Sequence, residues 1–209
     1  EGYPGDLSVV VDYVLDDSDA VHIEFKAFAH QATIVNLTHH SYFNLSGSET
    51  IDEHQVQVLS DHVLEMDEYG LPTGGIRSVD ETPLDLRAPK RIDEALASNF
   101  EPLVQKGGYD HTYVLSSEPG RLGPVARLFS AGAGVRLSLQ TDQPSLQLYT
   151  GQYMGGTPRG NGAFYGARAG VCLEAQGYPD APNHSAFPSI EVDAGALYRR
   201  SIVYRFEPD

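Results

Sequence analysis

The clearest pattern along the chain is an alternation of apolar and polar residues with a period of two. The segments Leu7–Leu15 and Val21–Phe28 alternate or run apolar, and both are rich in β-branched and aromatic side chains. Between them stands Asp16–Asp19, a polar break typical of a turn. Because successive side chains of a strand point to opposite faces, this pattern predicts a hairpin of two strands with a half-buried surface.

The same pattern continues to the end of the chain. Further runs of this kind are Thr33–Leu37, Gln55–Leu59, His111–Leu115, Val125–Ser130, Gly134–Gln140, Ser145–Thr150, Gly170–Glu174 and Tyr198–Phe206. Only Arg91–Ala97 resembles a helix, and the 21 glycines and 13 prolines fit a chain with many turns. We therefore expect an all-β protein of two packed sheets, with residues 1–209 forming a single domain.

The segment Gly151–Gly170 contains seven glycines. It is either a long surface loop or a phosphate-binding loop. A phosphate-binding loop needs a defined glycine pattern between a strand and a helix, together with a lysine. The segment has no lysine, so the sequence favours a surface loop.

The charge balance narrows the choice of partners. The chain has 14 basic and 29 acidic residues, for a net charge of −15. We expect no nucleic acid as partner, because binding its phosphates requires a surplus of Lys and Arg. We expect no membrane either, because anionic lipids would repel the chain and no apolar run approaches the roughly 18 residues of a membrane span. The expected partner is therefore a neutral small molecule or a protein. The single cysteine, Cys172, excludes an intramolecular disulfide, and with no leader in evidence it suits the cytoplasm.

Most of the eight histidines need no special role, but His39 and His40 form a pair in a segment rich in hydrogen-bonding side chains. On a strand the two would point to opposite faces, so at most one would face a given cleft. No second group of ligands at metal-binding spacing is present, and we therefore expect no metal site. A histidine directed into a cleft would be a suitable acid near neutral pH.

Two carboxylates also stand out. Asp110 follows two glycines and precedes an apolar run, so it is either a turn aspartate bonded to its own backbone or a functional residue. Glu174 lies in the apolar run Val171–Gln176. Burial of a carboxylate without a partner is costly, and desolvation would raise its pKa toward that of a usable general base.

Several segments together resemble the aldose 1-epimerases, the galactose mutarotase family. In order along the chain they are Glu1–Leu7, Asn36–Leu45, Leu71–Gly74, Pro83–Arg87, Gly108–His111, Leu146–Gly151, Gly170–Gln176, Tyr178–Asn183, Phe187-Pro188, Tyr198-Arg199 and Tyr204–Phe206. The resemblance implies an antiparallel β-sandwich that acts on a sugar such as galactose or glucose without cofactor or metal. It implies that His40 is the general acid and Glu174 the general base, and that Asp110 and Gln147 contact the sugar.

This sequence departs from the family's pattern in two respects. His39 stands where the family commonly has Asn, and we find no upstream Arg or second active-site His. The segment that opens this sequence lies in mid-chain in the family. We therefore expect the C-terminal two-thirds of an aldose 1-epimerase, lacking N-terminal strands that a separate piece could supply.

Two other functions remain open. One is a non-catalytic carbohydrate-binding or regulatory module that keeps the sugar site. The other is an epimerase of a hexose 6-phosphate, which should need a basic clamp for the phosphate. Arg159 and Arg168 are the candidates for that clamp.

Overall fold

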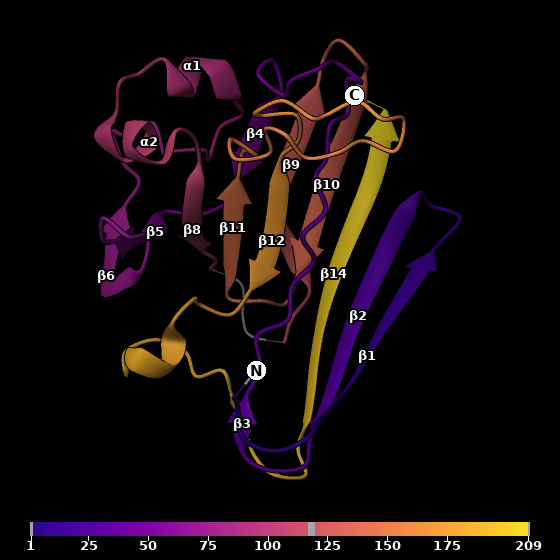
Figure 1. Cartoon of the computed structure of the whole chain (residues 1–209), viewed down its shortest axis with the longest axis vertical. Helices are drawn as coiled ribbons and strands as arrows, with labels where there is room; N and C mark the ends of the chain where they lie inside the picture. Colours follow the sequence, from indigo (N-terminus) through magenta and orange to yellow (C-terminus); the bar gives the residue numbers. More distant parts are fainter. Residues whose placement is uncertain (1, 117–119, 209) are drawn as a thin grey trace.

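The computed structural model describes residues 2–116 and 120–208 and shows two packed β-sheets with short helices at one end (Figure 1). The larger sheet has seven strands, in the order β1 (Leu7–Leu15), β2 (Ala20–Ala29), β14 (Leu197–Pro208), β10 (Val135–Thr141), β9 (Gly123–Ser130), β4 (Gln55–Val58) and β7 (Lys90–Arg91). The second has five, in the order β12 (Cys172–Gln176), β11 (Ser145–Tyr149), β8 (Asp110–Val114), β5 (His62–Met66) and β6 (Pro72–Ser78). A small third sheet pairs β13 (Glu191–Val192) with β3 (Thr33–Ile34).

All of these strand pairs are antiparallel, which confirms the predicted antiparallel all-β fold. The predicted helix is present as α1 (Ile92–Leu96). A second helix, α2 (Glu101–Lys106), and a 3₁₀ turn, η1 (Ala181–Asn183), were not expected from the sequence. Within the described residues, no helix is long and apolar enough to cross a membrane.

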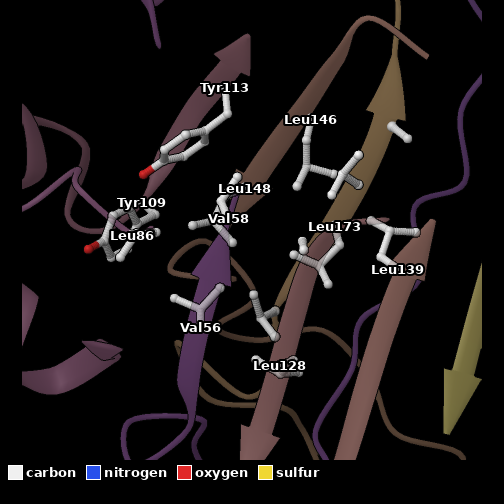
Figure 2. Close-up of a cluster of buried hydrophobic side chains, with 14 of the residues drawn as sticks. Val56, Val58, Leu86, Tyr109, Tyr113, Leu128, Leu139, Leu146, Leu148 and Leu173 are labelled. Carbon is white, nitrogen blue, oxygen red and sulfur yellow. The ribbon is translucent and has the colours of Figure 1, made fainter. Parts of the chain in front are cut away.

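The core lies between the two large sheets. Its apolar cluster draws on inward-facing side chains of both layers, including Val56, Val58, Leu128 and Leu139 from the seven-stranded sheet and Tyr113, Leu146, Leu148 and Leu173 from the five-stranded one (Figure 2). The buried Tyr113 hydroxyl donates a hydrogen bond to the carbonyl of Leu84, 3.0 Å away, so its polar end is satisfied. Burial of these apolar side chains away from water is the main contribution to the stability of the two packed sheets.

The predicted hairpin of β1 and β2 is confirmed by nine consecutive residue pairs. The predicted half-buried surface is wrong for β1, because all nine of its residues are exposed, whereas in β2 every second residue from Ile23 to Ala29 is buried. The difference arises because β1 is an edge strand and no second layer of described residues covers it (Figure 1).

The predicted strand Thr33–Leu37 is wrong in extent. Only Thr33–Ile34 pairs as a strand, and the chain from residue 35 to residue 42 is extended without a backbone ladder. The polar side chains of this segment form hydrogen bonds that substitute for strand pairing. This segment carries both His39 and His40.

Candidate active site

One outer face of the five-stranded sheet carries a block of polar and aromatic side chains. On β11, Leu146 and Leu148 point into the core, so Gln147 and Tyr149 point outward. Strand register extends this face across β8 and β12 in two rows: Thr112, Gln147 and Glu174, then Asp110, Tyr149 and Cys172. Three of the four candidate site residues therefore share one face because of the strand period and the pairing of three strands.

The fourth candidate, His40, comes from the extended segment that follows β3. This segment runs beside β12 (Figure 1), and three contacts hold it there: the amide of Asn36 with the backbone of Gly177, the hydroxyl of Thr38 with the carbonyl of Ala175, and a backbone bridge between Phe43 and Val171. The extended segment and β12 run in opposite directions, so these contacts place His40 beside Glu174.

The Nε2 atom of His40 lies 3.5 Å from the Oε1 atom of Glu174. The His40 side chain is 50% exposed, whereas that of Glu174 is only 10% exposed. Burial raises the pKa of Glu174, the nearby carboxylate of Asp110 adds to the rise, and His40 opposes it. A carboxylate with a raised pKa beside an imidazole is an arrangement suited to exchanging protons near neutral pH.

Asp110 and Gln147 are joined by a short chain of hydrogen bonds. The Gln147 amide nitrogen donates to Oδ1 of Asp110 at 2.6 Å, and the buried Thr112 hydroxyl donates to the Gln147 amide oxygen at 2.5 Å. The two contacts fix which end of the amide faces which neighbour. Both side chains are only partly buried, so they can still meet a ligand.

The alternative in which Asp110 is a turn aspartate is wrong. Asp110 is the first residue of β8, and its carboxylate accepts a hydrogen bond from Gln147 on the neighbouring strand. The preceding glycines have separate tasks. Gly107 ends α2 in the left-handed conformation, with φ of 69°, and Gly108 lies so close to Thr150 that a Cβ would stand 2.5 Å from its hydroxyl.

Three residues that the sequence analysis did not assign to the site also lie in it. The Tyr42 ring packs 5.1 Å from the His40 ring, and the Tyr149 ring lies 6.2 Å from each of them. Cys172 is fully buried, and its sulfur belongs with His40 and Glu174 to a group of potential metal ligands. The strand period could have indicated Tyr149 and Cys172, because each stands two residues from an outward-facing candidate.

His39 and His40 have different neighbours, as expected, although they are not on a strand. The His39 ring packs between Tyr13, at 5.7 Å, and Tyr204, at 5.6 Å. Burial lowers the pKa of His39, and neighbouring His40 lowers it further. His39 is therefore a packing residue between the sheet and the extended segment.

The glycine-rich segment is a loop, as the sequence favoured. Its two arginines already have carboxylate partners. Arg159 pairs with Glu49 at 2.7 Å, and Arg168 contacts both oxygens of Asp52 at 2.6 and 3.1 Å. Neither arginine extends an unpaired guanidinium toward the site, which weakens the interpretation as a hexose 6-phosphate epimerase.

Comparison with known sequences gives one consistent family. The chain matches the aldose 1-epimerase family over residues 1–205. It is 39% identical over 209 residues to the galactose mutarotase of Homo sapiens and 36% identical over 210 residues to the aldose 1-epimerase of Escherichia coli (strain K12). Each alignment takes in 99% of this chain but only 59% and 60% of the two relatives, so the chain spans about three-fifths of their length.

Solved structures agree in fold. The aldose epimerase homologue of C. elegans superposes with a TM-score of 0.89 at 31% identity, and galactose 1-epimerase of Lactobacillus acidophilus with a TM-score of 0.85 at 32% identity. The superpositions cover 99% of this chain and 62% and 58% of those chains. The two-sheet architecture and the family match over nearly the whole sequence lead to one conclusion: this chain belongs to the aldose 1-epimerase family.

Proposed function

We propose that this chain carries the acid–base centre of an aldose 1-epimerase that interconverts the α and β anomers of a hexose such as galactose or glucose. The observation that carries the proposal is the contact of His40 with the buried Glu174, beside the hydrogen-bonded pair of Asp110 and Gln147. The names of its relatives, galactose mutarotase and aldose 1-epimerase, support the same substrate class.

The chemistry needs one base and one acid at the anomeric carbon. Glu174 removes the proton of the anomeric hydroxyl while His40 protonates the ring oxygen, and the ring opens to the aldehyde. After rotation about the C1–C2 bond, His40 takes back its proton and Glu174 returns the other as the ring recloses. The two sugar oxygens are bonded to the same carbon, so groups 3.5 Å apart can each reach one of them.

The neighbouring residues hold the sugar in place for this exchange. Asp110 accepts and Gln147 donates hydrogen bonds to ring hydroxyls, which fixes the orientation of the anomeric carbon. The rings of Tyr42 and Tyr149 flank His40 and offer apolar surface to the faces of the sugar. Since proton transfer alone opens and closes the ring, the reaction requires neither a cofactor nor a metal.

The chain spans about three-fifths of the length of its relatives, so activity of the chain by itself is the first point to test. Freshly dissolved α-galactose would be followed by polarimetry in dilute buffer with and without the chain. We expect optical rotation to reach equilibrium faster with the chain, and E174Q to return the rate toward that of buffer. A wild-type rate equal to buffer would contradict catalysis by this chain.

Calorimetric titration with galactose distinguishes the enzyme from the alternative, a non-catalytic carbohydrate-binding module. Binding of galactose without faster anomer exchange would assign the chain to the non-catalytic carbohydrate-binding class. The same polarimetric assay with α-glucose compares the two sugars. We expect both sugars to react, because Asp110 and Gln147 form hydrogen bonds with ring hydroxyls, and both hexoses carry such hydroxyls.

A further inference from the structure

The site contains three potential metal ligands, of which the proposed reaction uses only two. The imidazole of His40, the thiol of Cys172 and the carboxylate of Glu174 place their ligand atoms within 4.8 Å of one another. Cys172 and Glu174 are two residues apart on β12 and so share its outer face, while His40 faces them from the extended segment. No spacing motif connects the three, because tertiary packing brings them together.

We propose that His40, Cys172 and Glu174 form a zinc-binding site, and that zinc bound there blocks proton transfer at the anomeric carbon. Sulfur, imidazole nitrogen and carboxylate oxygen are the three donor types that Zn²⁺ prefers. Three protein ligands leave the fourth tetrahedral position open to water. The binding site stands on the geometry alone, whereas the block of proton transfer rests on the proposed function.

The separations are close to what tetrahedral zinc requires. Bonds of about 2.0–2.3 Å place neighbouring ligand atoms about 3.3–3.8 Å apart. His40 and Glu174 already meet this at 3.5 Å. The Cys172 sulfur lies no more than 4.8 Å from the other two ligand atoms, so side-chain shifts of about 1 Å bring all three within this range.

The local charges also favour a cation. Glu174 and Asp110 stand on the same outer face of the five-stranded sheet, so two carboxylates face the site. On binding, the Cys172 thiol releases its proton to solvent, and the thiolate and the Glu174 carboxylate together balance the two positive charges of zinc.

Zinc at this position removes the groups that carry protons. The lone pair of His40 and the carboxylate of Glu174 become metal ligands, so neither can take a proton from the sugar. We expect free zinc to inhibit anomer exchange and a chelator to restore it.

The test uses the whole chain and two metals. Co²⁺ titration should show one site with a near-ultraviolet thiolate-to-cobalt absorption band, and Zn²⁺ should displace it. C172A should abolish the band, and both C172A and H40Q should weaken Zn²⁺ binding by at least about 100-fold, the upper end of what loss of an outer-shell partner alone costs. H62Q, which removes an exposed histidine of β5, is the matched control and should bind as wild type.

Circular dichroism checks whether C172A is folded. H40Q alters a half-exposed side chain, so it tests the site even if C172A does not fold. Absence of the thiolate band in wild type, or unchanged zinc affinity in both variants, would overturn the site. Rate measurements then test inhibition, and zinc that binds without slowing anomer exchange would overturn that part. A chain with no anomer exchange would contradict the proposed function while the metal titration still decides the site.

Discussion

Nε2 of His40 lies 3.5 Å from Oε1 of Glu174, although the first residue comes from an extended segment and the second from the middle of a strand. The histidine is half exposed and the carboxylate is almost covered. The imidazole is therefore open to solvent, and the carboxylate is held in a medium that favours its neutral form. This asymmetry is the basis of the first two predictions.

Replacing Glu174 by Gln should remove the base and keep the shape. We expect E174Q to lower the catalysed rate of anomer exchange by about 10²–10⁴, the usual contribution of a positioned acid or base. Polarimetry with α-galactose measures this. The matched control is E191Q, which alters an exposed glutamate of β13 and should leave the rate unchanged. An E174Q rate equal to wild type would remove Glu174 from the reaction.

The raised pKa of Glu174 has consequences for pH dependence. Because the base must be ionised, kcat/KM should rise with pH through the pKa of Glu174, and the acid limb should lie above the ordinary glutamate value of about 4.3. A limb at or below that value would contradict a desolvated base. E191Q should give the same profile as wild type.

The same shift predicts an effect on stability of the opposite sign. The folded state binds the Glu174 proton more tightly than the unfolded state does, so this group stabilises the fold most below its unfolded pKa. That contribution is lost as pH rises through the folded pKa. We would measure the free energy of unfolding in urea for both proteins at about pH 4 and about pH 7. Between these two pH values, wild type should lose stability relative to E174Q. A constant difference between the two proteins would contradict the prediction.

Much of the fold could be predicted from the sequence because sheet structure leaves a local trace. The hairpin of β1 and β2 was visible in its period and its acidic turn. Strands β5 and β6 were not, since β6 contains Pro72, Gly74 and Gly75, and its pairing with β5 shifts register between Leu64 and Met66. An edge strand tolerates such residues, but they erase the pattern.

The candidate site was predictable only in part, for a related reason. The strand period determines that Gln147 and Tyr149 share a face, but not which strands stand beside them. The place of His40 depends on Asn36 and Thr38, whose side chains replace backbone pairing along β12. Contacts of this kind leave no periodic signal, and the proximity of Cys172 to His40 was therefore invisible in the sequence.

The Thr112 hydroxyl should matter for sugar binding through Gln147. T112V preserves the shape of the buried side chain but removes the donor to the Gln147 amide oxygen. We expect KM for galactose to rise about 3- to 10-fold, the equivalent of about one hydrogen bond, with kcat within about 2-fold of wild type. T112S keeps a hydroxyl and should recover most of the loss. A fall in kcat at constant KM would instead place Gln147 in the chemical step.

Gly170 allows the extended segment to approach the sheet closely, because it has no Cβ. A Cβ at this position would lie 2.9 Å from the Cβ of Tyr42, closer than side chains pack. G170A should therefore push Tyr42 away from β12 and destabilise the fold by about 1–3 kcal/mol. Because His40 is two residues from Tyr42, the displacement should also separate His40 from Glu174 and slow anomer exchange in protein that remains fully folded.

Urea unfolding and polarimetry on the same preparation check both effects. The matched control is G166A, in the same loop, where an added Cβ meets open space and stability should stay within about 0.5 kcal/mol of wild type. If G170A retained both its stability and its rate, close contact with Tyr42 would not be what positions His40. Loss of rate beyond the folded fraction, found in G170A and absent from G166A, would locate the effect in the distance between His40 and Glu174.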